Sequence, residues 1–301
     1  MVCKMNKLLL VLLFIVGFTV LHKQISFVGQ RQQPNGNRQN LVVIYNKIPK
    51  TASTSFCKLV IRHHKNELYS INIQTINSSP LLTLQDQFRL VQNVTNWEEI
   101  TPAFYHGHFF YVEFTRFGSS LSPIYINIVR DPLERLVSHY YFLRFGDNFR
   151  TDLIRTKQGD TTTFDECFKR KHSDCRVDRL WLQIPYFCGQ ISECQKVGSR
   201  WALKEAKRNL VTKYLLVGIT EKLHDFIMLL ENMMPQMFEG LSEQYHKDKS
   251  TSHMRNTNKK VPLSAKTTRK IKSTKVWAME MEFYNFAKDR FQFIKAKILE
   301  S

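Results

Sequence analysis

The chain has 301 residues, of which 43% are hydrophobic and 23% are charged. This composition is typical of a globular protein rather than a disordered one, and the length allows one sizeable α/β domain after the N-terminal segments. With 44 Lys and Arg residues against 26 Asp and Glu residues, the formal net charge is +18, which favours a polyanionic partner. Nucleic acid, anionic lipid and sulfated polysaccharide all fit that charge, as does a basic surface that only aids solubility.

An apolar run from Leu8 to Leu21, interrupted only by Thr19, follows Lys4 and Lys7 near the N-terminus. As a helix it would cover about 21 Å, so a transmembrane segment here needs lysines that snorkel at its ends. The pattern predicts a retained signal anchor, and a cleaved signal peptide is the alternative. The expected organisation is a cytosolic tail over residues 1–7, a transmembrane segment over 8–21, a polar lumenal stem over 22–40 and a globular domain over 41–301.

The first part of the globular domain is a predicted strand over 41–48, a turn rich in hydroxyl groups, and a predicted helix over 52–64. The first N–H groups of this helix, the hydroxyl groups and the Lys50 ammonium would converge on one anion. The Walker pattern G-x-x-x-x-G-K-[ST] lacks its glycines here, which disfavours an ordinary ATPase or GTPase. A helix start capped by Ser or Thr is the alternative interpretation.

Two glycan acceptor sequons follow, Asn77-Ser78-Ser79 and Asn93-Val94-Thr95, and only a lumenal protein could use them. They lie close to a strand predicted near 67–73 and a helix predicted over 83–92. Such triplets arise often by chance, so each sequon alone is a weak signal. Together they agree with the lumenal body that the N-terminal segment predicts.

A strand predicted over 103–111 contains His106-Gly107-His108. Because alternate residues of a strand share one face, we expect both imidazoles to point the same way. A metal site is one alternative, although no Cys, Asp or His cluster of suitable spacing completes it. A pair of core histidines with satisfied hydrogen bonds is another.

The next strand, predicted over 123–130, ends at Arg130 and leads into a helix predicted over 132–145. Asp131 can cap this helix and Pro132 suits its first turn, so ordinary helix-start chemistry explains these two residues. It does not explain Arg130. An open parallel sheet binds ligands at the carboxyl ends of its strands, where a guanidinium can hold a phosphate with two hydrogen bonds.

Four cysteines in the middle of the chain are Cys167, Cys175, Cys188 and Cys194. Neither spacing fits a C-x-x-C zinc motif, so two local disulfides are the simpler prediction, and the sequence alone leaves their pairing open. Cys57, just inside the first helix, is expected to be an unpaired buried thiol.

The remaining elements continue the alternation of strands and helices, which predicts an α/β fold with a mostly parallel sheet covered by helices on both faces. The polar, basic stretch 245–260 reads as a long surface loop, and long loops in compact domains are often functional. The predicted elements are a helix over 198–209, a strand over 213–218, a helix over 221–233 and a packing helix over 276–299.

Several stretches resemble the heparan sulfate 2-O-sulfotransferases, Golgi enzymes that use 3'-phosphoadenosine 5'-phosphosulfate. They are PKTASTS (49–55), FYHGH (104–108), PIYINIVRDPLERLVSHYYFLRFGD (123–147), WLQIPYFCG (181–189) and VGSRWA (197–202), and the similarity runs from Leu41 to Phe293. The resemblance implies a P-loop-like sulfotransferase fold in a single-pass type II Golgi membrane protein, with the catalytic domain lumenal. It also implies a homotrimer, no metal, no nucleic acid, and the pairs Cys167–Cys175 and Cys188–Cys194.

The resemblance also implies a role for individual residues of the active site. His108 is expected to be the general base, because a neutral imidazole has a pKa near ~6.5 and can take the acceptor hydroxyl's proton. His106 would position the acceptor or assist proton transfer, and Lys50 would neutralise charge on the leaving phosphate. The implied donor-binding residues are Lys50, Thr51, Ala52, Ser53, Thr54 and Ser55, then Arg130 and Ser138 at the 3'-phosphate, and Tyr245, Ser252, Thr257 and Lys260 in a closing loop.

Three arginines, Arg150, Arg155 and Arg255, match substrate-contacting positions of similar enzymes, and a planar guanidinium suits carboxylate and sulfate oxygens. A solvated basic loop is the alternative. Lys47 stands where similar proteins usually carry arginine. Lys58 and Ile61 stand where Asn and Tyr are expected to face the sugar chain, which leaves open the preference between iduronic and glucuronic acid.

The sequence therefore predicts an enzyme that transfers a sulfuryl group to the 2-hydroxyl of hexuronic acid, mainly iduronic acid, in heparan sulfate. The alternatives are 2-O-sulfation of dermatan or chondroitin chains, a noncatalytic heparin-binding protein, and a nucleotide kinase. Polyanion binding alone requires neither the histidine pair nor Lys50. A kinase is disfavoured because the glycines and an evident magnesium-binding set are missing.

Overall fold

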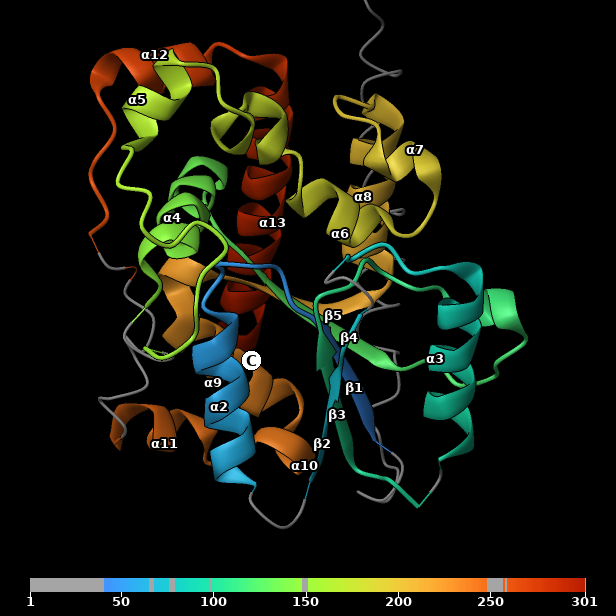
Figure 1. The fold of residues 1–301 in the computed structure, drawn as a ribbon. Helices are drawn as coiled ribbons and strands as arrows, with labels where there is room; N and C mark the ends of the chain where they lie inside the picture. The colour runs from blue at the N-terminus through green and yellow to red at the C-terminus, as the bar shows by residue number, and fades with distance from the viewer. Residues whose placement is uncertain are drawn as a thin grey trace, which may run out of the picture. The chain divides into compact units, whose positions relative to one another are not determined.

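Five parallel strands form the centre of the domain, in the spatial order β2-β3-β1-β4-β5 (Figure 1). The computed structural model describes residues 41–64, 68–75, 79–97, 99–147, 151–247, 257 and 259–300. All four strand pairs are parallel, which confirms the predicted α/β fold. The strands are β1 (Val42–Asn46), β2 (Tyr69–Ile73), β3 (Ala103–Gly107), β4 (Ile124–Val129) and β5 (Tyr214–Ile219).

Helices cover both faces of this sheet, so every residue of β1 is buried and the strand reads as a continuous apolar run. On one face, the Phe56 ring lies 5.4 Å from Tyr45 and 5.3 Å from Phe226. On the other, the Phe187 ring lies 4.6 Å from Tyr214 and 5.0 Å from Phe283. These contacts place α2 (Ser53–His63) and α9 (Leu223–Met233) on one face, and α6 (Gln183–Cys188) and α13 (Lys275–Glu300) on the other.

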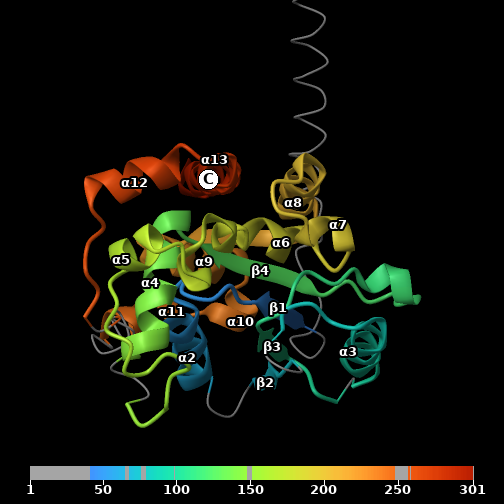
Figure 2. The same ribbon diagram turned by 45° about the horizontal axis from the view of Figure 1, so that its top comes forward.

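The other helices complete the two layers, and Figure 2 shows α8 and α13 on the opposite side of the sheet from α2 and α10. Helix α4 begins as predicted, because Asp131 accepts hydrogen bonds from the backbone N–H groups of Leu133 and Glu134 and Pro132 occupies the first helical position. The remaining α-helices are α3 (Leu84–Asn96), α4 (Pro132–Phe145), α5 (Phe164–Lys169), α7 (Ser192–Gln195), α8 (Arg200–Thr212), α10 (Pro235–Phe238), α11 (Leu241–Lys247) and α12 (Ala265–Lys272). The short 3₁₀ helices are η3 (Phe114–Phe117), η4 (Ser173–Cys175), η5 (Val177–Leu180) and η6 (Thr220–Lys222).

Gly107 ends β3 at a place where no side chain fits. A Cβ atom there would lie 2.6 Å from the Ile73 carbonyl oxygen of β2, which is closer than real Cβ atoms come to any other atom. The strand predicted over 103–111 stops at Gly107, because both of its partners end there: Asn46 of β1 and Ile73 of β2 are the last residues paired with it, and His108 lies beyond. The expectation that both histidines alternate along one strand is wrong for this reason.

A second buried cluster packs away from the sheet, around α4, α5 and α12. It contains Tyr140, Phe164 and Ile271 together with the disulfide between Cys167 and Cys175. The second disulfide joins Cys188 to Cys194, so both pairs have the connectivity that the resemblance implies. Cys57 is a buried cysteine that belongs to neither disulfide, as predicted.

Some predictions fall outside the described residues. These are the tail, anchor and stem over residues 1–40, the acceptor Asn77, and the site residues Arg150, Ser252 and Arg255. Within the described part of the chain, no helix is long and apolar enough to span a membrane. Asn93 is exposed on α3, and the hydroxyl group of Thr95 in the same sequon lies 3.0 Å from that of Ser119.

Glu280 is a fully buried carboxyl on α13 that holds the start of α6. Its Oε1 accepts hydrogen bonds from the backbone N–H groups of Leu182, at 2.9 Å, and Ile184, at 3.1 Å. Burial raises the pKa of Glu280 to about 7, although the Ile184 N–H and the charge of Arg135 oppose that rise. A group with this pKa is partly charged near neutral pH, where an uncompensated buried charge destabilises the fold.

We expect Glu280→Gln to remove a pH dependence of stability. An unfolded glutamate has a pKa of about 4.3, so between about pH 4.3 and pH 7 the folded protein binds more protons than the unfolded chain, and stability falls as pH rises. The free energy of unfolding of the variant should therefore exceed that of the parent at pH 7.5, by on the order of 2 kcal/mol, and match it near pH 4.5. Urea denaturation at both pH values measures this difference.

Glu282→Gln on the same helix is the matched control. Hydrogen bonding to Lys207 lowers the pKa of Glu282, so its loss should leave stability at pH 7.5 unchanged or reduced. Parallel stability curves for the parent and Glu280→Gln would contradict the role given to Glu280.

Candidate active site

The turn between β1 and α2 takes the backbone conformation of a phosphate-binding loop without any glycine. Lys50 has φ 68° and Ala52 has φ 60°, both in the left-handed region. Thr51 is buried between them, and its hydroxyl group donates a hydrogen bond to the Ile48 carbonyl at 2.9 Å. Alternation of left-handed and other residues turns successive N–H groups toward one point, which makes a concave anion site.

Helix α2 begins directly after this turn, and its first turn carries the hydroxyl groups that were predicted to face an anion. Ala52 occupies the N-cap position and supplies no side-chain acceptor for the first N–H groups. Ser53 and Ser55 are buried, and Thr54 is half-buried. The positive end of the helix dipole and these donors therefore favour a bound anion.

The Lys50 ammonium lies 4.2 Å from the centre of the Phe142 ring on α4. The Arg155 guanidinium lies 4.5 Å from the same ring and 3.4 Å from Asp147, which is itself buried. Two cations therefore share one aromatic ring, in the way cations bind the negative face of a π system. Arg155, predicted to contact substrate from a basic loop, has a side chain only 8% exposed and packs on the Phe142 ring beside Asp147.

Arg130 follows the last residue of β4 and lies beside the turn, since its Nη1 donates to the Lys50 carbonyl at 3.3 Å. The backbone of Arg130 is held by the side-chain amide of Gln183. Gln183 Oε1 accepts from the Arg130 N–H at 3.0 Å, and Gln183 Nε2 donates to the Arg130 carbonyl at 2.9 Å. Gln183 is fully buried at the start of α6 and fixes the backbone from which the guanidinium projects.

The sequence did not single out Gln183. It lies 53 positions from Arg130 along the chain, and no local pattern reports that contact. The WLQIPYFCG stretch was noted only as part of a resemblance. Only the fold brings the start of α6 against the end of β4.

The loop after α11 reaches the same region through Thr257. Its hydroxyl group lies 3.1 Å from that of Ser138, a buried residue of α4. Lys260 forms an ion pair with Glu134 at 2.6 Å, and Glu134 also lies 3.7 Å from Arg130. Arg130, Ser138, Thr257 and Lys260 are thus brought together around the first turns of α4.

Tyr245 lies outside this group, on α11. Its ring is nearly parallel to that of His224, with centroids 6.1 Å apart. Burial raises the pKa of its phenol, so this group stays neutral and can act as a hydrogen-bond donor.

His106 is a buried imidazole held between two polar side chains. Its Nδ1 lies 3.0 Å from Lys47 Nζ and its Nε2 lies 3.3 Å from Ser70 Oγ. An ammonium only donates, so Nδ1 accepts and Nε2 carries the proton. Burial, together with the nearby charge of Lys47, lowers the pKa of His106 to about 3. His106 is therefore neutral at physiological pH and a poor proton acceptor.

His108 is exposed and has the opposite tautomer. Its Nδ1 lies 2.6 Å from the Lys47 carbonyl oxygen, which only accepts, so Nδ1 carries the proton and donates it. The lone pair of the neutral ring is then on Nε2. A carbonyl oxygen that fixes the tautomer in this way is the arrangement by which a histidine is oriented as a general base.

A third histidine, His139 on α4, belongs to the same electrostatic environment. Burial, together with the charges of Arg135, Lys50 and Arg179 and a smaller effect of His108, lowers the pKa of His139 to about 3. No local pattern singles out this residue, which follows Ser138 within an ordinary helical pattern. His139 is therefore neutral at physiological pH, mainly because it is buried.

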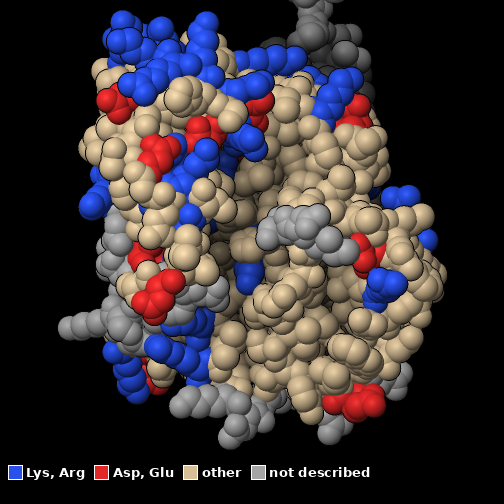
Figure 3. Space-filling view, viewed as in Figure 1, with Lys and Arg blue, Asp and Glu red and all other residues tan. Residues whose placement is uncertain are grey.

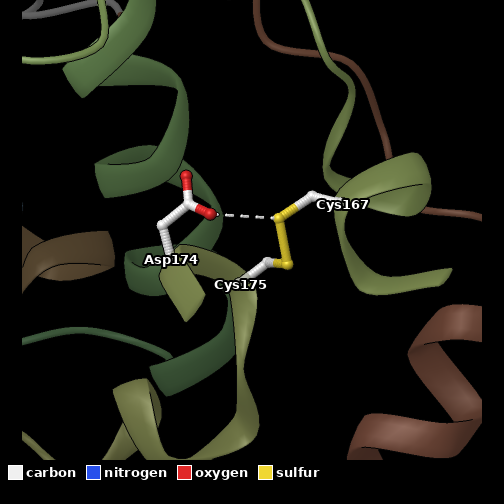
Figure 4. A group of neighbouring side chains, drawn as sticks. All are labelled: Cys167, Asp174 and Cys175. Atoms are coloured by element: carbon white, nitrogen blue, oxygen red, sulfur yellow. Dashed lines mark hydrogen bonds between the residues drawn. A yellow bond between two sulfur atoms is a disulfide. The ribbon is translucent and has the colours of Figure 1, made fainter. Parts of the chain in front are cut away.

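One group of side chains has the residue types of a metal site (Figure 4). Cys167, Asp174 and Cys175 place their donor atoms within 4.8 Å of one another. The two sulfur atoms are joined in a disulfide, so neither is the thiolate that a metal ion needs. The Asp174 carboxylate pairs with Arg144. These residues therefore do not fit a metal ion.

A cavity of about 250 Å³ lies between β2, β3 and α3, and Tyr105, Asp86 and Trp97 are among its lining residues. Among its described lining residues there is no lysine, arginine or histidine. An anion therefore has no counter-charge there, and the β1–α2 turn is the better anion site.

Comparisons with known proteins agree with this geometry. A family model described as "Sulfotransferase family" matches residues 37–287. The chain is 50% identical to heparan sulfate 2-O-sulfotransferase 1 of Xenopus laevis and of Homo sapiens, each over 282 residues that cover 91% of this chain and 79% of the relative. It is 47% identical to a heparin sulfate O-sulfotransferase of Drosophila melanogaster over 263 residues, covering 87% of this chain and 75% of the relative.

We expect Ala52→Gly to stabilise the protein. The left-handed conformation of Ala52 is destabilised by about 1–2 kcal/mol because its Cβ atom crowds the following carbonyl oxygen, and glycine has no Cβ atom. Because glycine also gains freedom in the unfolded chain, the net gain should be close to 1 kcal/mol. Thermal unfolding measures it as a rise in Tm.

Ala278→Gly provides the matched control, since Ala278 is exposed within α13. There glycine should lower stability by about 1 kcal/mol. Equal losses in both variants would show that the turn carries no strain at residue 52.

Proposed function

The chain belongs to the sulfotransferase family, and from that premise we propose that it transfers a sulfuryl group from 3'-phosphoadenosine 5'-phosphosulfate to the 2-hydroxyl of hexuronic acid in heparan sulfate. The observation that carries this proposal is the contact between His108 Nδ1 and the Lys47 carbonyl, which orients a histidine base beside an anion-binding turn. The relatives named for heparan sulfate 2-O-sulfation support the choice of acceptor.

The donor substrate fits the two cationic ends of this site. The β1–α2 turn, with the Lys50 ammonium and the first N–H groups of α2, suits a 5'-phosphosulfate. Arg130 and Ser138 suit the 3'-phosphate, because a guanidinium binds phosphate with two parallel hydrogen bonds. Tyr245, Ser252, Thr257 and Lys260 would close over the nucleotide, and the contact of Thr257 with Ser138 supports this arrangement.

The transfer step requires one proton acceptor and one stabiliser of the leaving group. The acceptor oxygen forms a bond to sulfur while the bond between sulfur and the 5'-phosphate oxygen breaks. The hydroxyl proton passes to His108 Nε2, and adenosine 3',5'-bisphosphate leaves. Lys50 neutralises the charge that builds on the phosphate oxygen, as cations do in phosphoryl transfer.

His106 acts through Lys47 rather than as a base. Its low pKa keeps it neutral, and its Nδ1 holds the Lys47 ammonium together with Asn72 Oδ1, which lies 3.4 Å from that ammonium. We assign to Lys47 the recognition of an acceptor anion, because a fixed ammonium is a point charge that suits a carboxylate. Arg150, Arg155 and Arg255 remain proposed contacts to the polysaccharide, with Arg155 acting from its buried position beside Phe142.

The cellular setting belongs to the same proposal. Two disulfides favour an oxidising compartment, which supports a lumenal domain. We propose a single-pass type II protein of the Golgi membrane, anchored by residues 8–21, able to carry glycans at Asn77 and Asn93, and assembled as a homotrimer.

The assay that tests the function measures transfer of radiolabelled sulfate from the donor to defined heparan, dermatan and chondroitin chains. His108→Ala should reduce kcat about 10²–10⁴-fold, because a positioned base contributes that much. Lys50→Ala should reduce it about 10²–10³-fold, as loss of a group that stabilises transition-state charge does. His172→Ala, which changes an exposed histidine after α5, is the control and should retain full activity.

Absence of transfer to any uronic acid by the parent protein would refute the proposed function. Full transfer by both His108→Ala and Lys50→Ala would instead refute the assigned roles while leaving the function intact.

A second prediction concerns Gln183, which positions Arg130. Gln183→Ala should raise the Kd for adenosine 3',5'-bisphosphate roughly tenfold, a loss of about 1.4 kcal/mol, and raise KM for the donor more than it lowers kcat. Isothermal titration and steady-state kinetics measure these effects.

Asn209→Ala is the control for this prediction. Asn209 is a buried amide of α8 that donates to the Phe187 carbonyl at 2.9 Å, on the same segment as Gln183 but without contact to Arg130. Both variants should lose stability, since each leaves buried backbone groups unsatisfied. Only Gln183→Ala should lose affinity, and equal affinity in the two variants would contradict the positioning role.

A further inference from the structure

Seven exposed cations gather on one surface formed by α12 and the end of α5. Helix α12 carries four of them and no acidic residue, and three consecutive cations lie at the end of α5. Figure 3 shows this concentration of Lys and Arg at the upper left of the molecule, over the α5 and α12 labels of Figure 1. We call it the α5–α12 basic surface, made of Lys169, Arg170, Lys171, Lys266, Arg269, Lys270 and Lys272.

The two halves of this surface are fixed to each other. Asp165 of α5 accepts hydrogen bonds from the backbone N–H and the hydroxyl group of Ser264, at 2.9 and 2.8 Å. Ser264 in turn caps α12. Beneath the cations, Phe164 and Ile271 lie in one buried cluster with the Cys167–Cys175 disulfide. The cations therefore project from one supported surface, which reduces the entropy lost on binding a ligand.

Acidic residues neutralise this surface only in part, through Glu166 of α5, whose pKa is lowered chiefly by hydrogen bonds from Thr163 and also by the charge of Arg170. Asp165 bonds to Ser264, Asp174 pairs with Arg144, and Asp178 pairs with Arg176. Within the described ranges, none of the seven cations forms an ion pair. Lys266 even lies in the first turn of α12, where the helix dipole disfavours a cation, so helix stabilisation alone does not account for it.

Figure 1 shows the turn that leads into α2 in the same view as the α5 and α12 labels, below them. Figure 3 shows a hollow near the centre of this face, and the basic surface stands above it on the same side. A linear polyanion seated in the hollow could therefore extend onto these cations without passing around the molecule. A short acceptor would occupy the hollow alone.

We propose that the α5–α12 basic surface is a remote subsite for the sulfated polysaccharide, binding anionic groups of the chain beyond the sugar that is modified. This inference rests on the proposed function, because it takes the acceptor to be a long polyanion. An anionic membrane is a weaker fit. Helices that bind membrane surfaces offer an exposed apolar face beside their cations, whereas Ile271 of α12 is buried.

The test compares acceptor lengths in two matched full-length variants. Lys266→Gln with Lys270→Gln removes two cations from the surface. Lys204→Gln with Lys288→Gln removes two other exposed lysines that form no ion pair among the described residues, on α8 and α13. Circular dichroism and Tm confirm that both variants are folded.

The surface variant should lower kcat/KM for long heparan sulfate about three- to tenfold, mainly through KM, and leave kcat/KM for a hexasaccharide unchanged. Its KM for the long chain should also depend less on salt, because fewer counterions are released on binding. The control variant should match the parent for both acceptors. An equal loss for both lengths, or no loss for either, would overturn the proposal.

Binding measurements separate this inference from the proposed function. The surface variant should elute from immobilised heparin at lower salt than the control variant, whether or not the protein transfers sulfate. Equal elution would overturn the remote subsite. The same two variants are tested for binding to vesicles that contain phosphatidylserine. If the surface variant loses vesicle binding without a change in heparin elution, the surface binds a membrane instead. A parent protein inactive on every acceptor would count against the proposed function and leave the heparin result to decide on the surface.

Discussion

Lys47 is the residue on which the arrangement of the site depends, because three of its groups contact the end of β3 and the residue that follows it. Its N–H donates to the Gly107 carbonyl at 2.8 Å, its ammonium lies 3.0 Å from His106, and its carbonyl accepts from His108 at 2.6 Å. The parallel pairing of β1 with β3 makes these contacts possible, since it sets Asn46 opposite Gly107. The β1–α2 turn begins three residues later, so the end of β1 positions both the proposed donor site and the proposed base.

Around the end of β1, strained backbone is held in one conformation by buried hydrogen bonds. Lys50 and Ala52 hold left-handed backbone without glycine, and such strain persists only where the surrounding structure supports it. Buried amides supply that support. Asn127 donates to the Asn46 carbonyl at 2.8 Å, and Gln183 holds the backbone of Arg130 from both sides. A fully satisfied buried polar network fixes one geometry, which a phosphate site requires.

The features that the sequence predicted correctly are those that depend on local patterns of residues. Apolar runs located the strands, and Arg130 was found because it follows such a run at the expected sheet edge. His108 shows the limit, because β3 ends where its partners β1 and β2 end, and no local pattern contains that pairing register. Arg155 was predicted to contact the substrate from a basic loop, and the sequence contained no sign of its contacts with Asp147 and Phe142, which arise from tertiary packing. Gln183 contacts the backbone of Arg130, which is 53 positions away in the chain, so no local sequence pattern indicated its role.

The charges of the site determine which ligand stabilises it. Burial, with a smaller effect of nearby cations, keeps His106 and His139 neutral, so neither imidazole adds to the positive charge of Lys47, Lys50 and Arg130. A ligand with several negative charges offsets the repulsion among these three cations, and any ligand that binds only the folded state stabilises it by mass action. An anion bound at the β1–α2 turn should therefore stabilise the folded domain as well as occupy the site.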